Sequence, residues 1–139
     1  MDRVETDAQG AAYVVDFKTG KHVVSGPELL THPQLGVYQL AVAEGAVDGV
    51  EAFEGERPEP GGAELVQLRQ PAGKGKEDRP KVQAQPSLAG DPGWVEDLLA
   101  EAADRIVNER FTPTVGPGCA NCSFRRSCTG HPEGRQVVE

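Results

Sequence analysis

An aspartate and a lysine stand two residues apart at the end of an apolar run: Asp16 and Lys18 in the stretch YVVDFKTGK. In a β-strand, side chains at positions i and i+2 point to the same side, so a strand here would present both charges on one face. A carboxylate there can hold a divalent cation, and a neighbouring ammonium can orient a water molecule or stabilise developing negative charge. Taken alone the pair is weak evidence, because strand ends commonly carry charged side chains that meet only water.

The sequence around this pair predicts a β-hairpin. Segments 2–6 and 11–17 flank the polar turn DAQG, and the second segment is apolar throughout, which favours a central place in a sheet. Asp2 lies on the strand that should pair with this one, so a second carboxylate would stand near Asp16. Two carboxylates, completed by waters and phosphate, are the oxygen ligands that Mg²⁺ or Mn²⁺ prefers.

The rest of the chain predicts further strands and helices around one sheet, in an α/β or mixed α+β fold. The order is helix, strand, strand, helix, over residues 31–45, 63–70, 81–87 and 91–111. Thr31 should cap the first helix, and Gly45 should follow its end. The last helix should begin at Asp91 and carry an apolar stripe of Trp94, Leu98, Leu99, Ala102, Ile106 and Val107.

Three cysteines fall within ten residues near the C-terminus: Cys119, Cys122 and Cys128. The N-terminal residues are polar and show no signal peptide, and in such a chain crowded cysteines indicate a metal site more than a disulfide. We expect residues 113–139 to form a cysteine-bearing tail behind a core of residues 1–112. His131 could complete a Cys₃His zinc set, and an empty or oxidised triad is the other alternative.

The overall charge limits the function classes. The net charge of −8 argues against a protein that simply coats DNA, because phosphate neutralisation drives that binding. It argues less against a metal-dependent nuclease, whose carboxylates are ligands. The positive charge is clustered in two places, Lys74, Lys76, Arg79 and Lys81 in one loop and Arg125 and Arg126 in another. No apolar run approaches the ~20 residues of a membrane helix, so we expect a cytoplasmic protein without a membrane partner.

Four stretches in one order, DRVE, VVDFKTGK, QLGVY and CANCSFRRSC, resemble the RecB-like branch of the PD-(D/E)XK nuclease superfamily. The resemblance covers nearly the whole chain and extends to the iron–sulfur, AddB-like members. The ending GHPEGRQV is similar to the C-terminus of actinobacterial helicase–nuclease subunits. The resemblance implies a restriction-endonuclease-like core, with a central mixed sheet flanked by helices, and Mg²⁺- or Mn²⁺-dependent hydrolysis of DNA.

The resemblance also implies a role for each matched residue. Asp2 and Asp16 match the family's two acidic metal ligands, and the backbone carbonyl of Phe17 matches the one that completes their shell. Lys18 matches the catalytic lysine. Gln34 and Tyr38 match the glutamine and tyrosine of the QLxxY helix, which face the active site and the DNA backbone. Their i, i+4 spacing puts them on one helix face, although Tyr38 could equally be a core aromatic with a satisfied hydroxyl.

The chain departs from the family at its start and in its cysteines. The family's domain begins with helices that carry a metal-ligating histidine and the first of four cluster cysteines, and here Asp2 directly follows Met1. Cys119, Cys122 and Cys128 match the last three ligands of a [4Fe–4S] cluster. We therefore expect a C-terminal fragment, with the N-terminal helices missing, of a longer helicase–nuclease. Such a fragment should have little activity alone, and its uncovered apolar surface should favour self-association.

The expected parent is a DNA nuclease fused to, or paired with, an ATP-driven helicase that processes DNA ends in recombinational repair. Its substrate would be single-stranded DNA of any sequence, because the matched residues address phosphate and metal and not base edges. Two rivals remain, a non-catalytic DNA-clamping module and a zinc-bearing interaction module.

Overall fold

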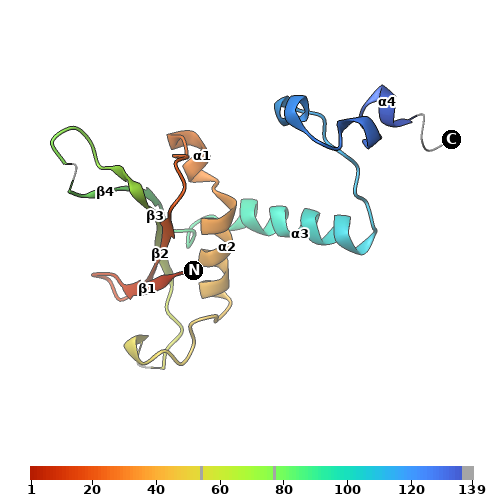
Figure 1. Ribbon diagram of the computed structural model, residues 1–139. Coiled ribbons are helices and arrows are strands. Elements are labelled where there is room, and N and C mark those ends of the chain that lie inside the picture. Colours follow the sequence, from red (N-terminus) through yellow and green to blue (C-terminus); the bar gives the residue numbers. More distant parts are fainter. Residues whose placement is uncertain (54, 77, 136–139) are drawn as a thin grey trace. The chain divides into compact units, whose positions relative to one another are not determined.

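The computed structural model describes residues 1–53, 55–76 and 78–135 (Figure 1). Two compact units are present, Met1–Leu99 and Ala100–Glu139. The first contains the sheet and the helices that pack on it. The second contains most of the last long helix and the cysteines. The predicted boundary between residues 112 and 113, which separates a nuclease core from a tail, stays a prediction.

The first unit is built on a four-stranded mixed sheet, as the sequence predicted. Its strands follow the order β1 (Arg3–Thr6), β2 (Ala12–Lys18), β3 (Pro60–Pro71) and β4 (Pro80–Gln85). β2 and β3 are parallel, whereas β1 and β4 are antiparallel to their neighbours. β2 is therefore an internal strand, which explains why its sequence is apolar on both faces until Asp16.

The β1–β2 hairpin is closed by an aspartate. Oδ1 of Asp7 accepts hydrogen bonds from the backbone N–H groups of Gln9, at 2.8 Å, and Ala11, at 2.9 Å. Gly10 has a φ of 86°, a conformation that glycine adopts without steric cost. The turn fixes a register in which Arg3 lies opposite Val15. Continued by one residue, this register puts Asp2 opposite Asp16.

Two helices cover one face of the sheet, α1 (Gly26–Leu30) and α2 (Pro33–Ala43) (Figure 1). The core lies between them and the sheet and contains Ala12, Val14, Leu29, Leu35, Val42, Val47, Phe53, Ala63 and Leu65. The alternation of Ala12 and Val14 on β2 places the next members of the series, Asp16 and Lys18, on this same helix-covered face. No described helix has the length and apolar character needed to cross a membrane.

The starts of these helices differ from the sequence prediction in two respects. α1 was not predicted, although Ser25 and Glu28 have the spacing of a capping box, and the backbone N–H of Ser25 donates to Glu28 Oε2 at 3.0 Å. Thr31 was predicted to cap α2, but His32 occupies that position. Pro33 fits the first helical position, so the cap must be the residue directly before it.

The helix α3 (Gly93–Val107) was correctly predicted, but most of its apolar stripe is not buried. Leu98 and Leu99 are 38% and 40% exposed, and Ile106 and Val107 are 65% and 78% exposed. Within the first unit the helix is anchored by Val95, which is fully buried, and by Trp94. The indole of Trp94 lies over Gly36 of α2, where an added Cβ would come within 2.4 Å of the ring.

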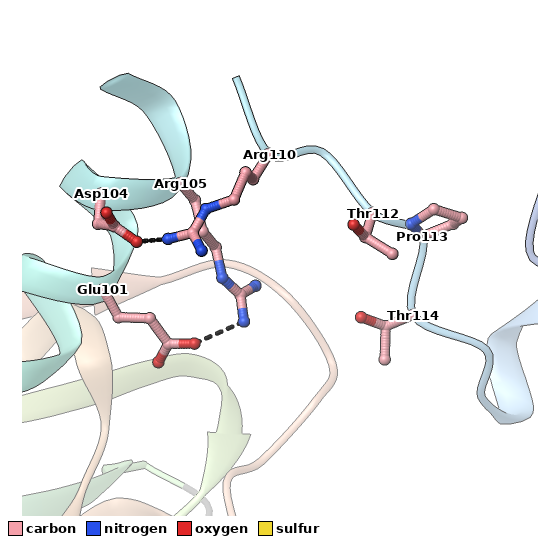
Figure 2. A pocket seen from close by; sticks show the side chains of 7 residues that line it. All are labelled: Glu101, Asp104, Arg105, Arg110, Thr112, Pro113 and Thr114. Carbon is pink, nitrogen blue, oxygen red and sulfur yellow. Dashed lines mark hydrogen bonds and ion pairs between the residues drawn. The ribbon is translucent and has the colours of Figure 1, made fainter. Parts of the chain in front are cut away.

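The second unit begins within α3, at Ala100, and includes the end of that helix. There Glu109 adopts a left-handed φ of 51°, and two arginines pair with carboxylates of the helix, Arg105 with Glu101 and Arg110 with Asp104. Figure 2 shows both guanidinium groups directed at these carboxylates, beside a hollow of about 400 Å³ that Thr112, Pro113 and Thr114 complete. Beyond it lie two short 3₁₀ helices (Pro117–Asn121 and Arg125–Ser127) and α4 (Pro132–Arg135). Both arginines are thus paired with carboxylates near the C-terminal end of the helix.

Substitution of Gly36 by alanine should destabilise the first unit. The added methyl would overlap the rigid indole of Trp94, and overpacking costs about 1–3 kcal/mol, against about 1 kcal/mol gained in helix propensity. We expect a net loss of up to about 2 kcal/mol in urea unfolding, followed by the fluorescence of Trp94, the single tryptophan.

Gly26 is the matched control, because a Cβ added there meets nothing within 4 Å. Gly26→Ala should leave stability within about 0.5 kcal/mol of the parent. Equal losses for the two variants would contradict the packing of Trp94 on Gly36.

Candidate active site

Asp16 and Lys18 form an ion pair at the end of β2. The Asp16 side chain is buried at 4% exposure, whereas that of Lys18 is 32% exposed, and Lys18 Nζ lies 2.6 Å from Asp16 Oδ2. The i, i+2 spacing predicted that the two would share a face, and they do. A buried carboxylate is thus held beside an ammonium that reaches solvent.

Gln34, in the first turn of α2, joins this pair to Tyr38. Its Oε1 accepts from Lys18 Nζ at 2.6 Å, and its Nε2 donates to Asp16 Oδ1 at 3.2 Å and to the Tyr38 hydroxyl at 2.7 Å. The amide therefore contacts Asp16, Lys18 and Tyr38 at once. Their side chains form one continuous polar network on the helix-covered face of the sheet.

Asp2 lies beside the network, on the residue before β1. Its Oδ2 accepts the backbone N–H of Phe17 at 2.8 Å, and the β1–β2 register continues to place it opposite Asp16. Residues directly opposite on paired strands point to the same face. The two carboxylates therefore stand on one side of the sheet, and the backbone of Phe17 passes between Asp16 and Lys18. The Phe17 side chain points to the other face and is 39% exposed.

His32 is a neighbour of the network that sequence reasoning did not assign to the site. Burial lowers its pKa first, the positive charge of Lys18 lowers it further, and Asp16 acts in the opposite direction. The lowered pKa favours the neutral imidazole, whose Nδ1 can accept the Leu35 N–H, at a long 3.5 Å. The sequence did offer one signal for the position of His32, because a residue directly before a proline that begins a helix is the expected helix cap.

Two buried glutamines, Gln85 and Gln39, fix α2, the helix that supplies Gln34 and Tyr38. Gln85 of β4 donates from Nε2 to the carbonyls of Leu29, at 2.9 Å, and His32, at 3.4 Å. Its Oε1 accepts from Gln39 of α2 at 3.0 Å, and both side chains are 1% exposed or less. Gln85 thereby satisfies carbonyls at the corner where α1 ends and α2 begins. Sequence reasoning missed both residues.

A second glutamine pair lies closer to Lys18. Gln67 of β3 is directly opposite Lys18 and donates to Gln83 Oε1 at 3.3 Å, and Gln83 donates to the carbonyl of Val24 at 2.7 Å. Gln67 Oε1 is buried and has no hydrogen-bond partner in the described part of the chain. A polar acceptor thus remains free beside the network.

The carboxylates suit a hard cation. Asp16 Oδ2 is buried and accepts no hydrogen bond within residues 1–53, 55–76 and 78–135, although it is ion-paired with Lys18. Mg²⁺ and Mn²⁺ sites use one or two carboxylates together with waters and substrate phosphate, and Asp2 and Asp16 could supply these. The described residues gather no group of three or more histidine, cysteine or acidic side chains that could hold a metal without such help.

The cysteines of the second unit are not brought together. Cys119, Cys122 and Cys128 are all free thiols, and they form no metal-binding group, with or without His131, in the described part of the chain. Cys119 Sγ accepts the N–H of Gly116 at 3.3 Å, and Cys122 is exposed. This arrangement fits neither a [4Fe–4S] cluster nor a Cys₃His zinc site.

Comparison with known families shows which family the chain belongs to. The family model for the PD-(D/E)XK nuclease superfamily matches residues 1–129. The chain belongs to this superfamily. The mixed sheet flanked by helices is consistent with its restriction-endonuclease-like fold, and membership identifies the chain as a nuclease domain, which would bind DNA. Nucleases of this superfamily usually use Mg²⁺ or Mn²⁺. No curated protein matches the chain.

Replacement of Gln85 by leucine tests whether this glutamine holds the α1–α2 corner. The change leaves buried carbonyls without a donor, and an unsatisfied buried group costs about 1–3 kcal/mol. We expect a loss of that size in urea unfolding.

Gln70→Leu is the control, since Gln70 donates at an exposed site to the carbonyl of Lys21. It should change stability by less than about 0.5 kcal/mol. If the two variants unfold alike, Gln85 does not hold the corner.

Proposed function

We propose that the chain carries the catalytic centre of a metal-dependent deoxyribonuclease that hydrolyses phosphodiester bonds. The observation that carries the proposal is the network that joins Lys18, Gln34 and Tyr38 to the buried Asp16, with Asp2 on the same face. Five polar side chains from two strands and a helix converge at one sheet end, in a chain of a nuclease superfamily.

Asp2, Asp16 and the Phe17 carbonyl are the groups that would hold Mg²⁺ or Mn²⁺. The bound cation supplies polarisation of the phosphate and a water of lowered pKa. Lys18 has three donors on a side chain that reaches solvent, so it can orient the attacking water and stabilise the negative charge that grows on the phosphate oxygens. As the water oxygen bonds to phosphorus, the bond to the leaving oxygen breaks.

Gln34 and Tyr38 position these groups. The Gln34 amide accepts from Lys18 and donates to Asp16, so it fixes the ammonium relative to the carboxylate. The Tyr38 hydroxyl accepts from Gln34, which leaves its own proton free for a phosphate oxygen. Both side chains are assigned to the lysine, the metal ligand and phosphate rather than to base edges, so the reaction should not depend on DNA sequence.

The finer parts of the proposal come from the sequence resemblance. The nuclease would be AddB-like, RecB-type and cytoplasmic, and would act on single strands delivered by an ATP-driven helicase in DNA end processing and repair. In the parent protein Cys119, Cys122 and Cys128 would bind a [4Fe–4S] cluster with a fourth cysteine from outside this chain. The spacing of the three cysteines supports this proposal, and the cluster itself would have to gather the thiols, which form no metal-binding group in the described residues.

Asp16→Ala in the full-length parent should abolish Mg²⁺-dependent cleavage, by about 10³-fold or more, because a ligand of the phosphate-bound cation is lost. ATP hydrolysis should remain, since Asp16 serves no motor site. The two rates are measured on the same preparation with labelled single-stranded DNA and a phosphate-release assay.

Asp48→Ala is a matched control, because Asp48 is an exposed aspartate that pairs with Arg57 outside the network. The Asp48→Ala variant should cleave DNA at the same rate as the protein without the substitution. Undiminished cleavage by Asp16→Ala would rule out the mechanism.

The isolated 139-residue chain should be a weak nuclease without a stable cluster. Two carboxylates bind Mg²⁺ loosely, and the three thiols do not converge. Anaerobic purification with iron and sulfide analysis, and a single-strand cleavage assay with Mg²⁺ and Mn²⁺, check this. A full iron complement together with robust cleavage would contradict it.

A further inference from the structure

The connection between β3 and β4 concentrates positive charge in an acidic chain. The net charge is −8, yet residues 69–81 contain five basic residues against two acidic ones. The basic residues are Arg69, Lys74, Lys76, Arg79 and Lys81. Of the acidic ones, Asp78 is exposed and Glu77 lies outside the described residues. We call residues 69–76 and 78–81 the basic hairpin.

The basic hairpin extends from the same end of the sheet as the candidate active site. β2 ends at Lys18, which lies opposite Gln67, and the parallel β3 runs on to Pro71, which pairs with Pro80. Four further residues at about 3.3 Å each carry the hairpin ~13 Å past Lys18. Figure 1 shows the β3–β4 loop projecting beyond the rest of the sheet. Gln70 ties it to the loop after β2 by donating to the Lys21 carbonyl at 3.0 Å.

The charges of the hairpin are available to a ligand. Lys74, Lys76 and Arg79 are exposed, and within the described residues none of the five basic side chains lies within ion-pair distance of a carboxylate. Arg57, by contrast, is neutralised by Asp48. An unneutralised cluster on a projecting loop is the electrostatic footprint of a polyanion site.

A row of side chains leads from the site to the loop, where a surface hollow lies. A hollow of about 520 Å³ is lined by Ala72, Lys76, Arg79, Pro80, Lys81 and Val82. Lys81 lies opposite Gln67, and Gln67 lies opposite Lys18, so the three occupy one row on the same face of the sheet. Lys18 and Lys81 therefore stand on either side of Gln67, in one row that leads from the site to the hairpin.

We propose that the basic hairpin binds the phosphates of a single DNA strand, several nucleotides from the bond that is cleaved. It makes contact through charge alone, because lysine acts as a point charge and phosphate contacts carry no sequence information. The placement of the cleaved bond rests on the proposed function, whereas the binding itself does not.

The test is the salt dependence of DNA binding by the 139-residue chain. Anisotropy of a labelled oligodeoxythymidylate of about 20 nucleotides is followed in EDTA, so that no cleavage occurs, from about 25 to about 200 mM NaCl. Lys74→Gln/Lys76→Gln removes two exposed charges from the loop. Because each contact contributes about 0.7 to the slope of log K against log salt, the slope should become shallower by about 1.4.

Two further variants separate local contact from general charge. The variant Arg57→Gln/Arg105→Gln changes the net charge by the same amount as the lysine-to-glutamine variant, but at two arginines that are already paired with carboxylates. It should keep the slope of the unsubstituted chain. The variant Lys74→Arg/Lys76→Arg keeps the charge and should bind DNA like the unsubstituted chain. Restored binding in the arginine variant excludes misfolding of the loop as the cause of the loss.

Three results would overturn the proposal: an unchanged slope in the glutamine variant, equal losses in the control, or binding to anionic phospholipid vesicles without binding to DNA. Since no metal is present, a failure of the nuclease assignment would leave this measurement unaffected. The reverse also holds, because cleavage that requires Asp16 could persist when the hairpin makes no contact.

Discussion

The ion pair between Asp16 and Lys18 constrains what is built around it. A carboxylate that is 3% exposed at the end of a central strand loses its hydration and is tolerated only with charged and hydrogen-bonding partners. Lys18 supplies the charge and Gln34 supplies the hydrogen bond. Gln34 lies on a helix, so α2 must hold its first turn at a fixed height over β2. Gln85 meets this requirement by binding the carbonyls at the α1–α2 corner.

Stability alone does not account for this arrangement. A buried ion pair seldom stabilises a fold more than apolar residues of similar volume, because desolvation offsets the Coulomb attraction. The neighbouring positions on the same face, Val14 and Leu65, are apolar and fully buried. Asp16 is therefore better explained by what its second oxygen, which accepts no hydrogen bond in the described residues, can bind. The neighbouring Asp2 carboxylate adds to the same negative potential, which favours a cation.

Local patterns in the sequence predicted much of this structure. Strand alternation placed Asp16 and Lys18 on one face, and helical spacing brought Gln34 and Tyr38 together, as their hydrogen bond shows. The glutamines of the core were not predictable in this way. Glutamine is usually found at the surface, so the sequence offered no reason to expect Gln39 and Gln85 in the core. Only the tertiary fold brings them next to buried carbonyls that need a donor.

Two other outcomes show the limits of pattern reasoning. Periodicity indicates which residues of α3 share a face, but not what covers that face, and Ile106 and Val107 are largely exposed. Likewise the spacing of Cys119, Cys122 and Cys128 indicates ligands of a metal without fixing the backbone between them. Ligand convergence in small metal sites usually depends on the metal itself, and the thiols remain apart here.

The most direct test of the central claim is to locate the cation on the isolated chain. Substoichiometric Mn²⁺ broadens the NMR signals of nearby backbone amides, which makes even loose binding visible. Our account predicts that the amides of Asp2, Asp16, Phe17 and Lys18 broaden first, and that Asp16→Ala removes the effect. Broadening confined to other carboxylates, such as those of the acidic segment 44–59, with the β2 signals unchanged, would contradict it.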